Sequence, residues 1–218
     1  MTPRVARVRP GLALCTVVGC LLGAAEARAQ GPGDGVYGRF DASWTMSLGV
    51  GAGASRRTEG GDAVPSVVGE LRFRHLDSAG PFVAGRWAPE GHGHVVVGAE
   101  IRPLFPLLFL ENLFTGHERW DLLIESWGLE LGAAVLPFDG EAGVGLAMGT
   151  GLEVPLVLSS TRARGLGLRL AFRYVHAPDR WQAGPARDAS EWTALATLAV
   201  DLALPSGGAS IRPPRGRR

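Results

Sequence analysis

The stretch FDASWTMSLGVGAGA, residues 40–54, alternates between apolar side chains and small or polar ones over its whole length. Phe40, Trp44 and Leu48 stand among the apolar residues at every second position, while Asp41, serine, threonine and glycine fill the positions between them. Successive side chains of a β-strand point to opposite faces of a sheet. This period of two therefore predicts a long strand.

The same period recurs along the chain in segments 142–157, 165–176 and 191–204, and less regularly in 66–76, 93–103 and 127–137. Segment 81–88 is short and its alternation is ambiguous. Asp77–Gly80 and Asp139-Gly140 are turn signals between such segments, and the second is a strong hairpin marker. Residues 105–126 break the alternation, and their leucines suit a short helix better than a strand. The pattern predicts an all-β fold: an antiparallel up-and-down barrel of about eight strands with one short helix.

The N-terminal 29 residues have the features of a secretory signal peptide. Arg4, Arg7 and Arg9 precede the apolar run 11–25, and Ala27-Arg28-Ala29 matches a small-x-small cleavage site. The run is shorter than the about 20 residues that a membrane-spanning helix needs. Val17–Cys20 loosely resembles a lipobox, so lipidation of Cys20 stays open, but simple removal of residues 1–29 is favoured.

After the signal peptide we expect a linker at 30–36, a barrel domain at 37–204 and a basic, disordered tail at 205–218. Both cysteines, Cys15 and Cys20, precede the linker. Disulfides, thiolate metal sites and cysteine nucleophiles are thereby excluded from the predicted barrel. A net charge of +1 offers no electrostatic case for binding nucleic acid.

Charged residues within the predicted strands lie on the face opposite the apolar one, and both signs occur there. In a narrow barrel this face would point inward, where arginine and carboxylate side chains would neutralise each other. The predicted interior charge network consists of Asp41, Glu70, Arg72, Arg74, Glu100, Arg102, Glu130, Glu153, Arg169, Arg173 and Asp201.

Aromatic residues fall near the predicted strand ends, as in the aromatic girdles of membrane barrels. The predicted interface aromatics are Tyr37, Phe40, Trp87, Trp120, Trp127, Phe138, Tyr174 and Trp192. Several strands also reach about ten residues, close to the ~9–11 that a transmembrane strand needs and longer than the about 5–6 usual in soluble sheets.

The run Trp127–Gly132, the run Gly151–Leu156, the signal peptide and the alternating strands together resemble the small eight-stranded outer-membrane β-barrel proteins of Gram-negative bacteria. This resemblance implies an outer-membrane location, a monomer, and lipid and the barrel assembly machinery as partners. It also implies a non-enzymatic role, either structural or in binding or passage of a small ligand. One feature departs from the family: the last strand ends at Leu204, before the tail, where such barrels usually close on an aromatic residue.

Two other functions fit the alternation. The first is a soluble periplasmic lipocalin-like barrel that binds lipid, in which the apolar face would line a cavity and the charged face would meet water. The direction of the charged side chains distinguishes it from the membrane barrel. The second is an outer-membrane lipid-modifying hydrolase, for which Ser126, His117 and Glu125 are near one another in sequence but match no recognisable motif.

No residue pattern supports a metal, a cofactor or a catalytic centre. Gly91-His92-Gly93-His94 offers two histidines without a third ligand. The glycines of 143–149 lack the spacing of a nucleotide-binding loop and continue a strand instead of opening a helix. We therefore predict no catalytic, metal-binding or cofactor-binding residues.

Overall fold

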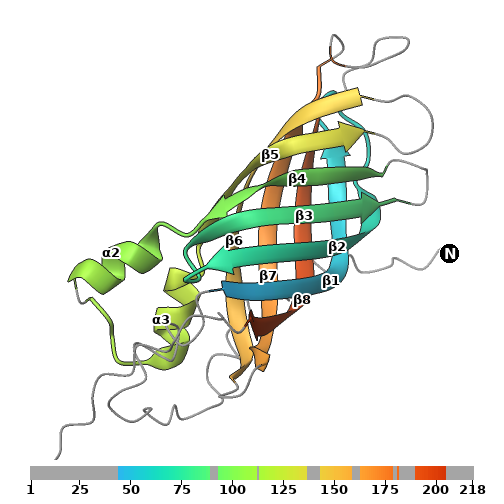
Figure 1. The fold of residues 1–218 in the computed structure, drawn as a ribbon. Coiled ribbons are helices and arrows are strands. Elements are labelled where there is room, and N and C mark those ends of the chain that lie inside the picture. The colour runs from blue at the N-terminus through green and yellow to red at the C-terminus, as the bar shows by residue number, and fades with distance from the viewer. Residues whose placement is uncertain are drawn as a thin grey trace, which may run out of the picture.

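The computed structural model describes residues 44–88, 93–111, 113–136, 143–158, 163–178, 181 and 190–204. Within these residues each strand pairs antiparallel with the next, and the last pairs with the first, so the sheet closes into a barrel (Figure 1). The predicted all-β class with eight strands is confirmed. The strands are β1 Trp44–Arg57, β2 Val64–His75, β3 Ala79–Trp87, β4 His94–Ile101, β5 Gly128–Leu136, β6 Gly143–Leu158, β7 Ala163–His176 and β8 Glu191–Leu204.

The barrel closes along the seam between β1 and β8, where the pairing runs from Trp44–Leu204 to Arg57–Glu191. At Gly51 the two backbones come so close that a Cβ atom would fall onto the carbonyl oxygen of Ala196 and lie 2.6 Å from Thr197 Cα. At Gly49, on the same face of β1, a Cβ atom would meet nothing closer than 3.6 Å. The seam therefore depends on glycine at position 51 but not at position 49.

We expect Gly51→Ala to destabilise the barrel by about 1–3 kcal/mol, because the added methyl group must push two strands apart. The matched variant Gly49→Ala should cost little or gain about 0.4–1 kcal/mol through the lower entropy of the unfolded chain. Urea unfolding of both variants in lipid vesicles measures the difference. Equal stability of the two variants would contradict the close approach at position 51.

The two faces of the barrel differ sharply in composition. Side chains on one face of each strand are buried in the barrel, and these include most of the charged ones. The opposite face exposes aliphatic side chains, among them Val50, Val67 and Leu131, which are 64%, 58% and 58% exposed. The charged face points inward and the apolar face outward, which is the reverse of the lipid-carrier arrangement.

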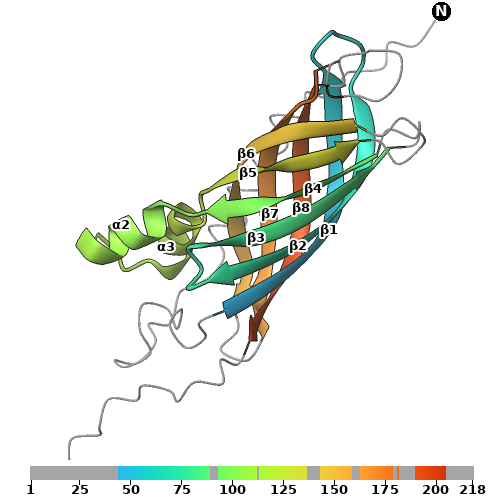
Figure 2. The ribbon, with the colours of Figure 1, turned by 45° about the horizontal axis from the view of Figure 1, so that its top comes forward.

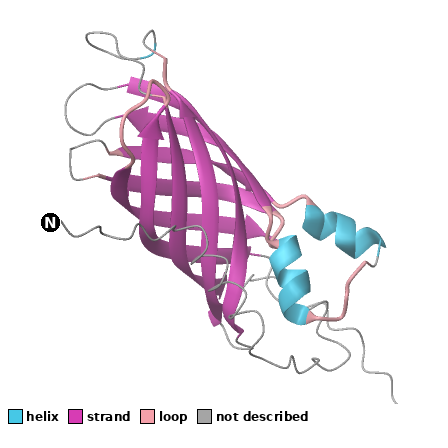
Figure 3. Cartoon of the chain, turned by 180° about the vertical axis from the view of Figure 1, so that it is seen from behind, coloured by secondary structure: helices cyan, strands magenta, loops and turns pink. Residues whose placement is uncertain are grey.

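Connection 102–127 holds two helices, α2 Leu104–Glu111 and α3 Glu118–Glu125, where the sequence predicted one. The break between them is stabilised by Asp121, whose carboxylate accepts hydrogen bonds from the backbone amides of Thr115 and Gly116 at 2.9 and 3.2 Å. Gly116 has a φ of +80°, a conformation that ends helices and favours glycine. Both helices lie at the end of the barrel where β1 begins and β8 ends (Figure 2), and Figure 3 shows both of them at one end of the barrel.

Neither helix among the described residues is long and apolar enough to cross a membrane.

The alternation predicted for residues 142–157 is wrong at the C-terminal end of β6. The pairing with β7 shifts between Pro155 and Val157, so Val157 is exposed instead of Leu156. Val154 was expected on the outer, apolar face but is only 1% exposed, and α3 packs against this strand. A bulge and a covering helix are tertiary features that a period of two does not contain.

Candidate functional site inside the barrel

Strands from all around the barrel bring five carboxylates and five guanidinium groups into the half of the interior nearest the two helices. Each of these side chains is mostly buried, and the ion pairs among them connect strands far apart in sequence. We call this set the charge cluster: Glu70, Glu100, Glu130, Glu153 and Asp201 with Arg72, Arg74, Arg102, Arg169 and Arg173.

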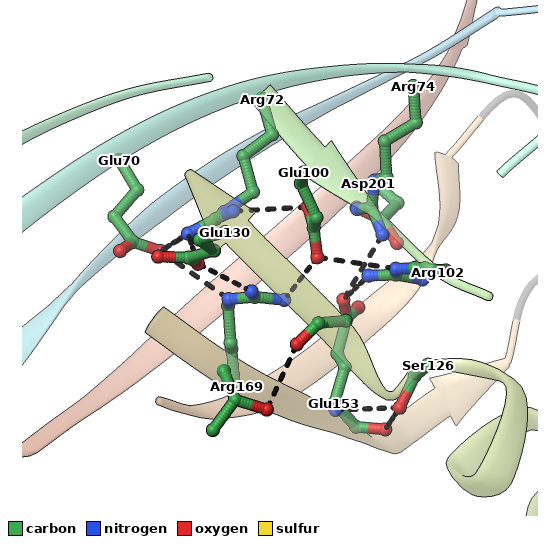
Figure 4. Close-up of polar contacts among 12 residues, drawn as sticks. Glu70, Arg72, Arg74, Glu100, Arg102, Ser126, Glu130, Glu153, Arg169 and Asp201 are labelled. Atoms are coloured by element: carbon green, nitrogen blue, oxygen red, sulfur yellow. Dashed lines mark hydrogen bonds and ion pairs between the residues drawn. The ribbon is translucent and has the colours of Figure 1, made fainter. Parts of the chain in front are cut away.

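The centre of the charge cluster is a pair of glutamates held together by two arginines (Figure 4). Glu100 on β4 and Glu130 on β5 are direct cross-strand partners, an arrangement in which like charges repel. Arg72 donates to Glu100 at 3.1 Å and to Glu130 at 2.8 Å. Arg169 contacts the same two carboxylates at 3.0 and 2.8 Å. The repulsion is therefore offset by two guanidiniums that each bridge both carboxylates.

Glu130 lies within 2.8 Å of three arginines of the charge cluster. Besides Arg72 and Arg169 it accepts from Arg173 at 2.8 Å, and Arg173 also reaches Glu70 at 3.2 Å. Phe82 on β3 lies against this group, its ring centroid 4.8 Å from the Arg72 guanidinium carbon and 5.5 Å from that of Arg173. Such cation–π contacts add stabilisation where water is absent.

The remaining members of the charge cluster lie closer to the helical end. Arg102 donates to Glu153 at 2.9 Å and contacts Glu100 at 3.4 Å, which joins the two parts. Arg74 donates to Asp201 at 3.0 Å and to Glu153 at 3.4 Å. These contacts join β2, β6 and β8 across the interior.

Formal charges in the charge cluster balance, five negative against five positive. Burying an ion is costly unless a partner and hydrogen bonds compensate it, so this balance is what allows so many charges to occupy a narrow interior. The long arginine side chains also fill the lumen between opposite walls. The charge cluster therefore connects the strands through ion pairs and blocks the interior of the barrel.

A second, smaller group lies at the opposite end of the interior, and sequence reasoning missed two of its members, Arg86 and Glu191. Arg86 donates to Ser55 at 2.6 Å and to Glu191 at 2.9 Å, and His94 Nδ1 lies 3.1 Å from Glu191. Glu191 is ten residues before Asp201 on β8, so the period of two already placed both on one face. Arg86 lies in the short segment whose alternation was ambiguous.

Most of the apolar side chains buried in the interior lie between the charge cluster and this second group. They form one contiguous buried set: Phe82, Ala84, Val96, Ala134, Ala147, Val175 and Ala177. In the described part of the barrel the lumen thus holds charged, apolar and again charged layers along its length.

The predicted aromatic residues have different positions. Trp127 and Trp87 lie at opposite ends of the barrel, exposed on its outer face, and Trp192 stacks on half-exposed Tyr174 with ring centroids 4.3 Å apart. Trp120 is on helix α3, not at a strand end, because the 105–126 segment contains a second helix. Asp41, Tyr37, Phe40 and Phe138 lie outside the described residues.

The residues considered for a hydrolase do not form a triad. His117 precedes the first turn of α3 and Ser126 follows its last, so a helix of about 12 Å, at 1.5 Å per residue, separates them. Across the described ranges, no group of three or more histidine, cysteine, aspartate and glutamate side chains is arranged to hold a metal ion, and His92 lies outside those ranges.

Ser126 instead holds β6 to the start of β5. The last β5–β6 pair joins Gly128 to Gly151, so Glu153 has no β5 residue beside it. The Ser126 hydroxyl accepts from the Glu153 amide at 2.8 Å, and its oxygen lies 3.0 Å from the Glu153 carbonyl and 2.7 Å from that of Leu123. One side chain thus replaces a strand neighbour and holds the end of α3 against β6.

We expect Ser126→Ala to destabilise the barrel by about 1–3 kcal/mol, because it leaves a buried backbone amide and carbonyl of Glu153 without partners. Hydrogen exchange at the Glu153 amide should accelerate, and urea unfolding gives the stability. Ser78→Ala is the matched control, since that hydroxyl bonds the His75 carbonyl at an exposed turn. Unchanged exchange at Glu153 would contradict the role assigned to Ser126.

Comparison with protein-family models and with curated proteins finds no match. Among solved structures, the barrel is similar to Ail, the attachment invasion locus protein of Yersinia pestis, in complex with the heparin analogue sucrose octasulfate: 13% identity, 73% of this chain and 99% of that chain covered, TM-score 0.42. A second is Neisserial surface protein A, with 11% identity, 74% and 97% coverage and a TM-score of 0.38. Both are eight-stranded outer-membrane β-barrels of Gram-negative bacteria, the class that the sequence resembles. Likeness at this level bears on neither binding nor activity in this chain.

Proposed function

We propose that this protein is an outer-membrane β-barrel with a closed lumen, which serves as a structural membrane protein and not as a general pore or an enzyme. The observation that carries the proposal is the inside-out distribution of side chains, with ten balanced charges within the barrel and aliphatic residues exposed outside. A bilayer accepts a closed barrel because every backbone hydrogen-bonding group of its strands is paired.

The outer face supports a lipid environment over water. Among the outward strand positions whose side chains are described, none carries aspartate or glutamate, and the one arginine, Arg56, is next to the last residue of β1. Exposed tryptophans lie toward both ends, Trp44 and Trp127 at one and Trp87 and Trp192 at the other. This order, aliphatic in the middle and aromatic at the rims, is typical of membrane barrels. Lipid is thus the main partner of a monomeric barrel.

The packed interior favours a structural role over passage of solutes. Eight strands enclose a space just wide enough for side chains. The arginines of the charge cluster reach across it to opposite walls, as from Arg74 on β2 to Asp201 on β8. Passage would require these ion pairs to break.

Fractionation and a swelling assay test the proposal. The protein should be recovered in the outer-membrane fraction and migrate faster on a gel before boiling than after, as folded barrels do. Liposomes that contain it should not swell in arabinose, whereas liposomes with a general porin, the positive control, should. Recovery in the soluble periplasm without detergent would overturn the membrane assignment, and swelling comparable to the porin would overturn the closed lumen.

A further inference from the structure

Helix α3 exposes two large apolar residues and buries two acidic ones beside Leu122, which is unusual for a helix that faces water. Trp120 and Ile124, four residues apart on one face, are 46% and 40% exposed. Asp121 and Glu125, four apart on another face, are 2% and 0% exposed. A surface helix of a water-soluble protein turns its apolar face to the core. The exposed face of α3 therefore has the composition of the outer wall of the barrel.

The acidic face of α3 is held inward by specific contacts, so the inversion is built into the fold. Asp121 accepts three hydrogen bonds, from the Thr115 amide and hydroxyl at 2.9 and 2.7 Å and from the Gly116 amide at 3.2 Å. At the C-terminal end of the helix, Ser126 binds the backbone of Glu153 on β6. Rotating α3 to expose its acidic face would break both sets of contacts.

Helix α2 is apolar almost throughout, with the sequence LFPLLFLE and its first charge at Glu111. Leu107 on α2 and Leu113 just after it are 51% and 59% exposed. Among described residues, the two helices and the link between them thus expose large apolar side chains at four positions.

Along the chain, both helices adjoin exposed apolar residues of the outer face of the barrel. Helix α3 runs into Trp127 and then Leu129 at the start of β5, and Ile101 ends β4 just before α2. These three residues are 37%, 46% and 56% exposed on the outer wall. Exposed apolar residues therefore lie on both sides of the β4–α2 junction and of the α3–β5 junction.

We propose that α2 and α3 lie in the bilayer, in the lipid leaflet at the end of the barrel where β1 begins and β8 ends. The ligand class is membrane lipid: acyl chains contact Leu107, Leu113 and Ile124, and Trp120 lies at the boundary with the headgroups. In this arrangement α2 and α3 form a segment at the membrane interface that is attached to the barrel wall, and we call this segment the helical foot. This inference rests on the proposed membrane location of the barrel and adds that the longest described connection is also embedded.

Spin-label accessibility in dilauroylphosphatidylcholine vesicles tests the proposal. In the full chain with Cys15 and Cys20 replaced by serine, a nitroxide is attached through Leu107→Cys or Ile124→Cys. Leu131→Cys on the outer wall is the lipid reference, and Asp62→Cys in the exposed β1–β2 connection is the water reference. Each label is assayed with oxygen, which enters lipid, and with a nickel chelate, which stays in water. Leu113→Cys and Trp120→Cys replace any variant that loses the gel shift of the folded barrel.

The oxygen-to-nickel ratio at 107 and 124 should exceed that at 62 several-fold and lie below that at 131, because an interfacial helix lies at a shallower depth than the middle of the barrel wall. A ratio at 107 and 124 equal to that at 62, with 131 still lipid-like, would overturn the helical foot and leave the membrane barrel standing. Protection from both reagents at 107 and 124 would overturn it, because these side chains would then be buried against protein, either their own chain or a second copy of it. A water-like ratio at 131 as well would overturn the membrane barrel and the foot together.

Discussion

Leu131→Arg should destabilise the barrel by roughly 2–4 kcal/mol in lipid vesicles, the cost of an arginine on the lipid-facing side near the middle of a membrane. Leu131 lies within β5, is 58% exposed and has Ala99 and Met148 as cross-strand neighbours. In a water-soluble barrel the same exposed leucine would accept arginine within about 0.5 kcal/mol. Unfolding in urea, followed by the gel shift of the folded form, measures the difference.

Asp62→Arg is the control for adding an arginine to an exposed position outside the strands. It should leave stability within about 0.5 kcal/mol of the parent. If Leu131→Arg were equally harmless, the outer wall would face water and the membrane location would be wrong.

Glu130→Gln should destabilise the barrel by about 3–5 kcal/mol, because it removes one partner from a buried ion-pair network and leaves the others uncompensated. The substitution keeps the side-chain shape, so packing changes little. Arg72, Arg169 and Arg173 each lie 2.8 Å from the Glu130 carboxylate. Equilibrium unfolding in vesicles measures the loss.

The double variant Glu130→Gln/Arg173→Gln restores equal numbers of positive and negative charges in the charge cluster. Its loss in free energy of unfolding should therefore be smaller than the sum of the losses in the two single variants. A double-mutant cycle gives the coupling energy between the two side chains. Glu59→Gln, at an exposed residue of the β1–β2 turn, should change stability by no more than about 0.5 kcal/mol. Additive losses for Glu130 and Arg173 would contradict a shared network.

Strand positions were predictable because the period of two is a local property of the chain. The predicted segment 191–204 coincides with β8, and 81–88 differs from β3, Ala79–Trp87, by two residues at one end and one at the other. The predicted exposure of side chains was wrong where a bulge or a packed helix altered the strand. The bulge near Pro155 and the packing of α3 changed which β6 residues are exposed, and neither is encoded in alternation.

Membership of the charge cluster was predictable in part, because face and sign can be read from position and residue type. Its pairings were not, since they depend on which strands meet across the closed interior. Arg72, for example, reaches Glu130, which is 58 residues away in sequence. Arg86 and Glu191 were missed because one lies in a weakly alternating segment and the other at the first residue of a strand.

By itself, the sequence determined that the chain contains long strands with one apolar and one charged face, because side chains alternate along any extended backbone. Only the tertiary structure decided that the charged face points inward. The alternation is the same whether the charged face points into the barrel or out of it, and the way the sheet closes determines which of the two occurs. It also decided the inverted orientation of α3, which follows from contacts that Asp121 and Ser126 make with the loop before the helix and with β6. Local periodicity specifies the elements, whereas contacts between elements specify which side of each element faces outward.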